Sequence, residues 1–342
     1  MERRNFLSLL AAGSLSLPAW AKAASPKGVM RQGSAAYGNF LKAIRALAIE
    51  QGVPETVLSQ ALGGLRAPNE QVLARQRHQP EFTLTWAQYR ARVLGDARFA
   101  TGVTTYSQVQ SVMDPIAARY RCDSSIIMGI WGLESSFGTT QGKFNVIDAL
   151  ATLAFASHRT GFFRNELLKA LKILGRGDIS PDMMLGSYAG AMGQPQFMPS
   201  AYLRYGVDGD GDGKCDIWNS QPDVFASIAH YISGSGWHYG QPWGEEVAVP
   251  LGENGQFFDG AARNYRQSQS RSVSEWASLG ITRPDGSALD MTLPAARLIQ
   301  PDGPGTEAFL VYPNFKAIRA YNPSDFYALA VGILGQRSTE AR

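Results

Sequence analysis

Several kinds of residue and segment are scarce in this sequence of 342 residues. It has only two cysteines, and its four histidines show no metal-ligand spacing with them or with each other, which argues against a Cys/His metal site. The formal net charge is +3, and removal of residues 1–23, which hold three basic residues and one acidic residue, leaves about +1. This balance gives no electrostatic case for nucleic acid or an anionic membrane as the partner. No internal repeat or low-complexity segment is present.

A long hydrophobic run is also missing. The apolar stretch 6–17 is too short to span a membrane, but it follows Arg3 and Arg4 and precedes a small-residue cleavage site at 21–23. This pattern predicts a signal peptide over residues 1–23 and a periplasmic protein. The basic start also resembles a twin-arginine signal, an ordinary export signal being the alternative. No cysteine follows the apolar run, so we expect no stable membrane anchor, and we expect a monomer.

Helical periodicity dominates what is present. Apolar residues recur at helical spacing over 40–48 and 57–62, and further patterns follow at 69–77, 84–94, 105–120, 126–133, 146–155, 162–174, 223–235 and 325–334. From residue 244 to about 311 the chain is instead punctuated by glycine and proline, with short apolar runs typical of strands. The sequence therefore predicts an α+β fold, mainly α, with a small β-rich insertion. In an oxidising compartment Cys122 and Cys215 are expected to form one disulfide, two buried thiols being the alternative.

Three segments carry candidate chemistry, and the first is IWGLESSFG at 130–138. Glu134 is the one charged side chain in an apolar helix, whose N-cap is expected at Asp123 or Ser124. Burial at the end of such a helix disfavours the carboxylate and raises the pKa of the glutamate. A protonated carboxyl near neutral pH suits a general acid acting on a glycosidic oxygen. The alternative is a glutamate that turns outward or caps a neighbouring loop.

The second segment is SYAGAMGQPQFMPS at 187–200. Its small residues allow close approach of a ligand to the backbone, and Ser187 and Gln196 can hydrogen-bond to sugar hydroxyl and acetamido groups. Tyr188 and Phe197 offer flat faces for sugar rings. A tight turn with incidental polar residues is the alternative.

The third segment, DGDGDGKCDIWN at 208–219, follows the calcium-loop template. Asp208, Asp210 and Asp212 supply oxygens at positions 1, 3 and 5, glycine is at position 6, and Lys214 would offer its carbonyl at position 7. Position 12 is an asparagine, so Asp223 is the expected last carboxylate. An Asp/Gly turn that binds nothing is the alternative, but three aspartates so placed repel one another without a cation.

Together and in this order, these segments resemble the membrane-bound lytic murein transglycosylase B family. The resemblance extends through NVIDALATLAF at 145–155, FFRNELLKAL at 162–171 and NFKAIRAYNPSDFYALAV at 314–331. It implies a lysozyme-like core with a helical N-terminal domain and a small β domain. The expected boundaries are a signal peptide at 1–23, a helical domain at 35–100, the catalytic core with its calcium loop at 101–240, the β-rich domain at 241–312 and a C-terminal segment returning to the core at 313–342.

The resemblance also implies roles for individual residues. Glu134 matches the catalytic glutamate. Glycan contacts match at Ser187, Gln196, Tyr231 and Tyr321, and the structural Ca²⁺ ligands at Asp208, Asp210, Asp212, Lys214 and Asp223. Phe315 and Lys316 stand where a further cleft aromatic is expected, which is a departure from the family pattern. No organic cofactor is implied.

The predicted function is that of a lytic murein transglycosylase, which cleaves the MurNAc–GlcNAc β-1,4 bond of peptidoglycan glycan strands and leaves 1,6-anhydroMurNAc ends. Two alternatives stay open: a hydrolytic muramidase, and a non-catalytic, calcium-dependent peptidoglycan-binding protein. Glycosidases usually employ two carboxylates, but near Glu134 in sequence the nearest acids are Asp123, expected to be a cap, and Asp148, expected to be solvated.

Overall fold

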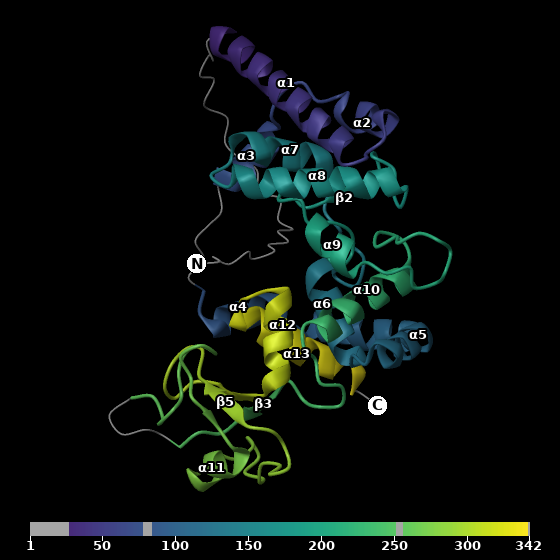
Figure 1. Cartoon of the computed structure of the whole chain (residues 1–342). Coiled ribbons are helices and arrows are strands. Elements are labelled where there is room, and N and C mark those ends of the chain that lie inside the picture. Colours follow the sequence, from purple (N-terminus) through teal and green to yellow (C-terminus); the bar gives the residue numbers. More distant parts are fainter. Residues whose placement is uncertain (1–26, 78–83, 251–255, 341–342) are drawn as a thin grey trace. The chain divides into compact units, whose positions relative to one another are not determined.

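The computed structural model describes residues 27–77, 84–250 and 256–340 (Figure 1). The signal peptide expected at residues 1–23 lies outside these ranges. The described chain divides into two compact units: unit 1 comprises 84–137 and 228–340, and unit 2 comprises 27–77 and 138–227. A search of the described helices finds none with the length and apolar character that crossing a membrane requires.

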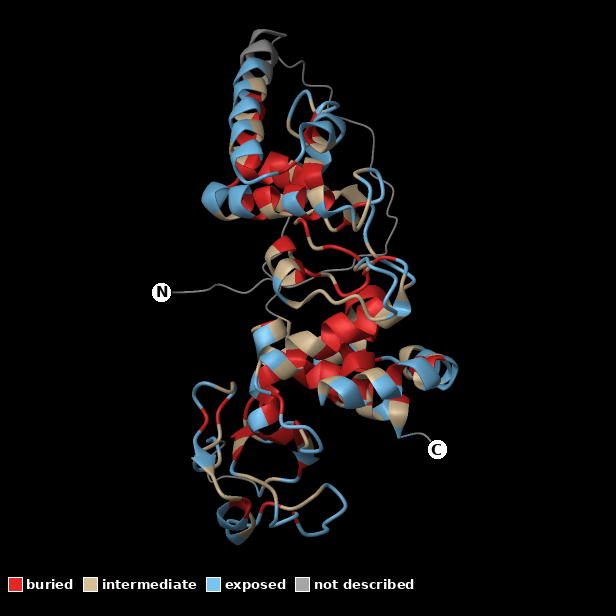
Figure 2. Cartoon of the chain, turned by 45° about the vertical axis from the view of Figure 1, so that its right-hand side comes forward, coloured by how far each residue is buried: buried red, intermediate tan, exposed pale blue. Residues whose placement is uncertain are grey.

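Unit 2 is a helical assembly with one small two-stranded sheet. Its elements are α1 Lys27–Glu50, α2 Glu55–Leu62, α3 Glu70–Arg77, β1 Phe144–Asn145, α7 Val146–Ala156, α8 Thr160–Arg176, β2 Leu185–Gly186, α9 Pro199–Tyr205 and the start of α10 Gln221–Gly234. Helices α7 and α8 pack against each other and form the buried centre (Figure 2). The side chain of Asn145 caps α7 by accepting a hydrogen bond from the backbone N–H of Asp148 at 3.1 Å.

Unit 1 contains a second group of helices. These are α4 Trp86–Val93, α5 Asp96–Tyr120, α6 Ser124–Ser135, α12 Pro313–Tyr321 and α13 Asp325–Thr339, with the last turns of α10. Helix α6 is apolar on nearly every side, as its sequence predicts, and it packs along α13. Glycines allow this close approach: a Cβ built on Gly129 would lie 2.1 Å from the carbonyl oxygen of Val331, and one on Gly335 would lie 1.9 Å from that of Ser125.

The rest of unit 1 is the β-rich region that the sequence predicts. Strands β3 Gly244–Val247, β4 Ser270–Arg271, β5 Ala296–Ile299 and β6 Ala308–Val311 form an antiparallel sheet in the order β3-β6-β5-β4, with α11 Val273–Ser278 beside it. Leu298 pairs with Leu310 in the centre of the sheet, and both are fully buried with Trp276. The observed architecture, mainly helical with small antiparallel sheets, confirms the predicted α+β class.

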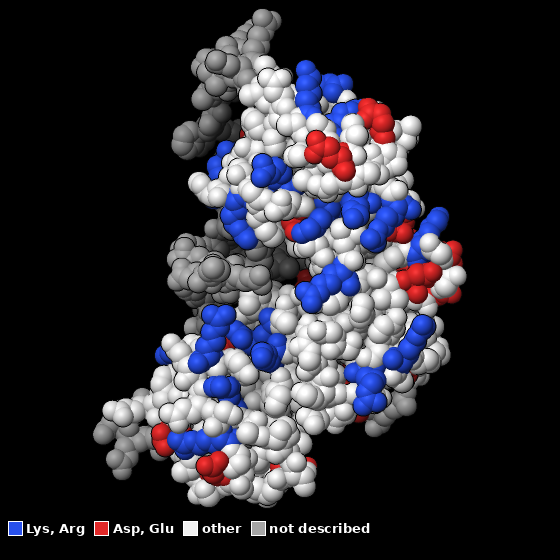
Figure 3. All heavy atoms as spheres, in the orientation of Figure 1, with Lys and Arg blue, Asp and Glu red and all other residues white. Residues whose placement is uncertain are grey.

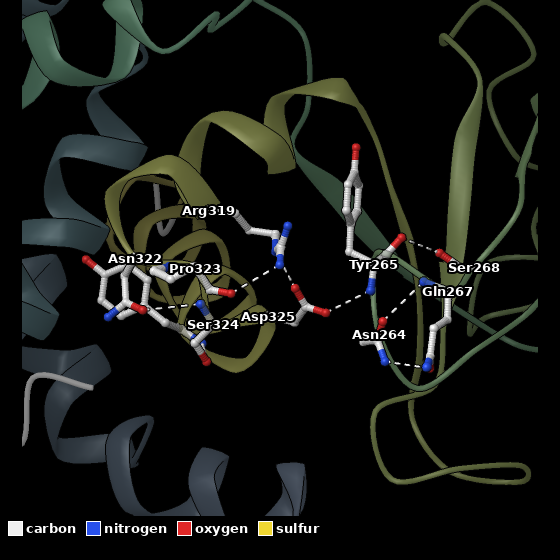
Figure 4. A network of polar contacts seen from close by, with 10 residues as sticks. Asn264, Tyr265, Gln267, Ser268, Arg319, Asn322, Pro323, Ser324 and Asp325 are labelled. Carbon is white, nitrogen blue, oxygen red and sulfur yellow. Dashed lines mark hydrogen bonds and ion pairs between the residues drawn. The ribbon is translucent and has the colours of Figure 1, made fainter. Parts of the chain in front are cut away.

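A polar network joins the β-rich region to α12 and α13 (Figure 4). Asp325, at the start of α13, accepts a hydrogen bond from the backbone N–H of Tyr265 at 2.7 Å and forms an ion pair with Arg319 of α12. The Arg319 guanidinium also lies 5.1 Å from the centre of the Tyr265 ring. These contacts fix the segment before β4 against the helices of unit 1.

Candidate active site

Glu134 lies in the last turn of α6, and its side chain is only 3% exposed. The chain leaves the helix in an uncommon way, because Ser136 and Phe137 both adopt positive φ angles, of 49° and 58°. Such conformations are costly for residues other than glycine and concentrate at functional sites. Helix α6 ends at Ser135, one residue after Glu134.

A row of tyrosines from three other helices extends from the Glu134 carboxyl. The Tyr327 hydroxyl, from α13, donates a hydrogen bond of 2.8 Å to Glu134 Oε1. Tyr321 stacks on Tyr327 with ring centres 6.4 Å apart and an interplanar angle of 7°. Tyr231 of α10 continues the row, with its ring 4.7 Å from that of Tyr321 and its hydroxyl donating to the Ala320 carbonyl at 2.8 Å. Two of the residues predicted to contact glycan, Tyr231 and Tyr321, therefore belong to the same aromatic row as the Glu134 partner.

Burial and the nearby carboxyl keep these phenols protonated. Burial raises the pKa of Tyr321 and Tyr327 well above the usual value for tyrosine, and the negative charge of Glu134 raises both further. Tyr89 on α4 behaves in the same way: burial is the larger cause of its raised pKa, Glu134 adds to it, and Arg98 opposes it. A phenol that stays neutral can donate a hydrogen bond to a carboxylate but cannot take a proton from it.

Arg98 of α5 supports the end of α6. Its Nη1 donates to the carbonyl oxygen of Gly132 at 2.9 Å, and burial lowers the pKa of its guanidinium. The last carbonyls of a helix carry partial negative charge and lack partners within the helix, so a cation stabilises them. Arg98 therefore fixes the backbone two residues before Glu134.

Sequence reasoning did not single out Tyr89, Arg98 or Tyr327. Each lies on a helix other than α6, and its proximity to Glu134 depends on how α4, α5 and α13 pack. The segment 314–331, which carries the family resemblance, contains both Tyr321 and Tyr327. Only Tyr321 was predicted to contact glycan.

Asp123 occupies the expected N-cap position of α6, but its side chain does not cap the helix. Its Oδ2 instead accepts a hydrogen bond of 2.7 Å from Nε1 of Trp237. Burial raises the pKa of Asp123, and the bond from Trp237 opposes that rise. The expectation of a side-chain cap was therefore wrong, because the buried indole N–H needs an acceptor.

The 187–200 segment lies in unit 2, where its polar residues shape the loop. The Ser187 hydroxyl accepts hydrogen bonds from the backbone N–H groups of Ala189 at 3.3 Å and Ala191 at 3.0 Å. Gln196 has a positive φ of 52°, and its Nε2 donates to the carbonyls of Gln141 and Gly193 at 3.0 and 2.8 Å. Both side chains are half-buried, so they stabilise the turn by hydrogen bonds and remain partly exposed.

The two aromatics of this segment differ. Tyr188 is half-buried, with its ring edge-on to Phe144 at 6.5 Å. Phe197 is only 2% exposed, and its backbone pairs with that of Met192. Phe197 therefore has no open face for a sugar, and its expected role as a platform is replaced by one in the core of unit 2.

The acidic loop of unit 2 has the arrangement expected of a cation site. One carboxylate oxygen from each of Asp208, Asp210 and Asp212 lies within 4.8 Å of the other two. Gly213, at position 6 of the template, has a positive φ of 91°, which the sharp turn requires. Asp208 accepts the N–H groups of Gly211 and Gly213, and these bonds lower its pKa. The Lys214 backbone N–H donates to Asp212 at 2.8 Å.

Asp223 closes the loop from the first turn of α10. It is 1% exposed and accepts the N–H groups of Gly209 at 2.8 Å and Asp216 at 2.6 Å. Burial is the main cause of its raised pKa, and the negative charge of Asp210 adds to it. Asn219, at template position 12, instead donates to Asp216. These residues fit a hard divalent cation, because they gather carboxylate oxygens in one loop.

The acidic loop and the 187–200 segment are joined directly. The Gln194 backbone N–H donates to the Ile217 carbonyl at 2.9 Å, and its Nε2 donates to the Trp218 carbonyl at 2.9 Å. The Trp218 indole in turn donates to the Leu185 carbonyl at 2.8 Å. A cation that ordered the loop would therefore also order the segment carrying Ser187 and Gln196.

The two cysteines are free, contrary to the expectation of a disulfide. Cys122 is completely buried in unit 1, and burial raises the pKa of its thiol well above the usual value. Cys215 is half-buried in unit 2, where its sulfur lies 4.0 Å from the Ser227 hydroxyl. Each thiol is packed within its own unit, so the alternative of two buried free thiols holds for Cys122, while Cys215 is free but only half-buried.

Comparison with known proteins gives consistent matches. The family model described as "Transglycosylase SLT domain" matches residues 36–336. The curated Membrane-bound lytic murein transglycosylase B of Escherichia coli (strain K12) is 35% identical over 261 residues, which cover 75% of this chain and 68% of that protein.

Solved structures agree with these sequence matches. SltB3 from Pseudomonas aeruginosa, in complex with NAG-anhNAM-pentapeptide, has 39% identity and a TM-score of 0.82, covering 88% of this chain and 79% of that one. The Escherichia coli lytic transglycosylase Slt35, in complex with calcium, has 28% identity and a TM-score of 0.71, covering 90% of this chain and 93% of that one.

Proposed function

Because this chain belongs to the transglycosylase SLT domain family and is a lytic transglycosylase of peptidoglycan, we propose that Glu134 is its catalytic acid and base. The family resemblance drawn from the sequence is thereby confirmed, and the role of Glu134 is the proposal. One observation carries it: Glu134 is 3% exposed, and its Oε1 accepts the hydroxyl of Tyr327 at 2.8 Å.

The surroundings of Glu134 suit a carboxyl that both gives and takes a proton. Burial disfavours its charged form, while the hydrogen bond from Tyr327 favours it. Each protonation state therefore has one stabilising influence in the site. Such a group can act as an acid in one step and as a base in the next.

The proposed reaction needs no water. Protonated Glu134 donates to the oxygen that joins MurNAc to GlcNAc, and the C–O bond to the anomeric carbon breaks. The acetamido group of the substrate stabilises the positive charge that develops at the anomeric carbon. The Glu134 carboxylate then takes the proton of the muramyl 6-hydroxyl, whose oxygen bonds to the anomeric carbon and forms a 1,6-anhydroMurNAc end. The Glu134 proton is thereby restored.

The acids nearest in sequence have other partners, which supports a single-carboxyl mechanism. Asp123 accepts the Trp237 indole, and Asp148 accepts the Asn69 side-chain N–H at 2.6 Å in unit 2. Asp148 is thus hydrogen-bonded within the fold, whereas the sequence suggested a solvated residue. Asp123 and Asp148 are therefore not expected to act as nucleophiles.

The glycan contacts are proposed residue by residue. In unit 1 we assign this role to Tyr231 and Tyr321, which share an aromatic row with the partner of Glu134. In unit 2 we assign it to Ser187, Gln196 and Tyr188, whose half-buried side chains reach the surface. Phe197 is left out of this set because of its burial.

We also propose a single structural Ca²⁺ at the acidic loop. Its ligands would be carboxylates of Asp208, Asp210, Asp212 and Asp223, with the carbonyl of Lys214. The close carboxylate oxygens of the first three residues support this, as does the positive φ of Gly213. A relative was solved in complex with calcium. The ion would neutralise the loop and hold it against the 187–200 segment.

The organisation of the chain completes the proposal. We propose the boundaries 1–23, 35–100, 101–240, 241–312 and 313–342 for the signal peptide, helical domain, catalytic core, β-rich domain and C-terminal segment. Export to the periplasm follows from the sequence of residues 1–23 and from a substrate that lies in the cell wall. We propose a monomer that takes glycan strands as its partner. On the face that Figure 3 shows, basic side chains (blue) are spread over the surface, with smaller groups of acidic side chains (red) among them.

Mass spectrometry of digested glycan strands tests this function. The mature protein is compared with Glu134→Gln, a nearly isosteric change that removes the proton donor. We expect anhydromuramyl products from the wild type and a loss of at least about a thousandfold in rate from the variant, with binding of strands retained.

The other outcomes are equally distinct. Reducing-end products, heavier by one water, would make the protein a hydrolytic muramidase. Undiminished cleavage by Glu134→Gln would move the catalytic role to another residue. Strand binding without products from either protein would indicate the non-catalytic, calcium-dependent binding protein.

A further inference from the structure

The first turn of α4 is held by a residue of the β-rich region. Asp302, in the loop between β5 and β6, accepts the backbone N–H of Trp86 at 2.5 Å and that of Ala87 at 2.8 Å. Thr85 accepts the N–H of Gln88 at 3.2 Å. The first N–H groups of a helix have no partners within the helix, so these acceptors fix where α4 starts. Two of the three bonds go to a carboxylate that is more than two hundred positions away in the chain.

A second carboxylate of the same loop binds side chains of α4. Glu307 Oε2 accepts the indole Nε1–H of Trp86 at 2.5 Å, and Glu307 Oε1 forms an ion pair with Arg90. The Trp86 side chain is only 1% exposed, so its N–H needs an acceptor from the protein. The side chains of Arg90 and Glu307 are 27% and 30% exposed, and an ion pair at that exposure adds little stability. The bond to the indole is therefore the more important contact.

Trp86 connects this loop to the aromatic residues beside the candidate active site. Its ring meets Phe309 of β6 edge-on at 5.9 Å and lies 5.7 Å from the ring of Phe326 on α13. Tyr89, one turn further along α4, has its ring 6.2 Å from that of Trp86 and 5.8 Å from that of Phe326. In the chain, Phe326 directly precedes the tyrosine that donates a hydrogen bond to Glu134. Trp86 therefore contacts both the β-rich region and the residues near the catalytic carboxyl.

The position of α4 matters at Glu134 because α4 carries Tyr89. The negative charge of Glu134 adds to the rise in the pKa of Tyr89 that burial causes, so the phenol is near that carboxyl. Helix α4 has 8 residues, and isolated helices of that length are marginal in water, so contacts within unit 1 determine its position. At a reacting centre, a displacement of about 1 Å can cost on the order of a hundredfold in rate.

From this series of contacts we infer that Glu307 is a positioning residue for the reaction: through the Trp86 indole it determines where α4 places Tyr89 beside Glu134. Asp302 assists by fixing the first turn of the same helix. The inference rests on the catalytic role proposed for Glu134. It gives the β-rich region a function in catalysis, because the loop between β5 and β6 holds a helix of the active site in place.

The test is a double-mutant cycle on the mature full chain, with cleavage of glycan strands as the activity. Glu307→Ala removes the acceptor of the Trp86 indole, whereas Glu307→Gln keeps an acceptor and removes only the charge. Each variant is made alone and together with Tyr89→Phe, which removes the phenol oxygen and keeps the ring. The matched control is Glu246→Ala, which changes an exposed glutamate of β3 that has no side-chain partner within the described part of the chain.

We expect Glu307→Ala to lower kcat about tenfold and to change KM by less than about twofold, because it displaces a group at the reacting centre. Glu307→Gln should keep kcat within about threefold of wild type, since its amide oxygen still accepts the indole N–H. In the Tyr89→Phe background, Glu307→Ala should cost less than about threefold, because the residue through which it acts is already changed. Trp86→Phe, which lacks the indole N–H, should lower kcat as Glu307→Ala does. Glu246→Ala should match wild type.

Hydrogen exchange of the α4 amides supplies a second measurement that needs no cleavage. Glu307→Ala should speed exchange in α4 and not in the rest of unit 1, whereas Glu246→Ala should leave α4 unchanged. The inference is overturned if Glu307→Ala leaves exchange in α4 unchanged, or if it lowers kcat equally with and without Tyr89→Phe. Full activity of Glu134→Gln would instead contradict the proposed catalyst, and faster exchange confined to α4 would still support the positioning of that helix by Glu307.

Discussion

The Tyr327 hydroxyl donates a hydrogen bond of 2.8 Å to Glu134 Oε1, which joins α13 to the last turn of α6 across 193 positions of the chain. Both side chains are buried, at 4% and 3% exposed. A hydrogen bond to a buried carboxyl orients it and stabilises its charged form. The catalytic role proposed for Glu134 therefore depends on a residue from the other end of the chain.

Tyr327→Phe removes this hydrogen bond and keeps the ring. We expect kcat to fall about tenfold, in line with roughly 1–2 kcal/mol for such a bond. Without the donor, the charged form of Glu134 is less stable, so the general acid stays protonated to higher pH. The high-pH limb of the pH–rate profile should therefore move upward. Tyr239→Phe, which changes an exposed tyrosine, is the matched control. An unshifted profile for Tyr327→Phe would argue against this role for the hydrogen bond.

Gly129→Ala should separate α6 from α13. The added Cβ would lie 2.1 Å from the Val331 carbonyl oxygen, and backbone can yield only if the helices move. We expect a loss of about 1–3 kcal/mol in the free energy of unfolding and a fall in kcat, because Glu134 and Tyr327 lie on these two helices. Gly38→Ala on α1, where a Cβ meets nothing within 4 Å, should be neutral or slightly stabilising. Denaturant unfolding measures both, and equal stabilities would refute the packing argument.

Calcium should stabilise the protein through the acidic loop. At a Ca²⁺ concentration one hundred times Kd, linkage predicts about 2.7 kcal/mol of stabilisation, and chelation should remove it. Thermal unfolding with Ca²⁺ and with a chelator measures the effect, for which we expect a shift in Tm of about 4 °C. Asp210→Asn should abolish the response, whereas Asp182→Asn, an exposed aspartate outside the loop, should keep it. A full response from Asp210→Asn would place the ion elsewhere.

Asp325→Asn should loosen the β-rich region. It weakens the ion pair with Arg319 and the hydrogen bond from the Tyr265 N–H, at a site where the two side chains are 9% and 13% exposed. We expect a loss of about 2 kcal/mol in the free energy of unfolding. Asp259→Asn breaks the pair with Arg271, but Asp259 is 74% exposed, so little change is expected. Chemical denaturation of both variants decides whether burial makes the difference.

Most elements of the fold could be predicted because their signals are local. The helix at 69–77 is observed at Glu70–Arg77, and the one at 223–235 at Gln221–Gly234. One of the short apolar runs expected between residues 244 and 311 is strand β6, Ala308–Val311. Boundaries were predicted less well: the helix expected at 105–120 begins at Asp96.

By itself, the sequence determined the family, the α+β class and two local features, the acidic loop and the lone Glu134 of α6. The three aspartates of the acidic loop are two residues apart, so chain connectivity alone brings their carboxylates together. Glu134 could be found because a single acidic residue in an apolar helix is visible in the sequence, whatever the helix packs against.

Tertiary structure alone decided which groups meet Glu134 and which residues are withdrawn from the surface. Tyr89, Arg98 and Tyr327 come from three different helices. The Asp123 side chain accepts a hydrogen bond from the Trp237 indole, 114 positions away, and does not cap α6. The Phe197 ring is buried in the core, so it offers no exposed face to a ligand. These outcomes depend on helix packing, where burial of apolar surface and the need to pair buried polar atoms act over long sequence separations that no local pattern records.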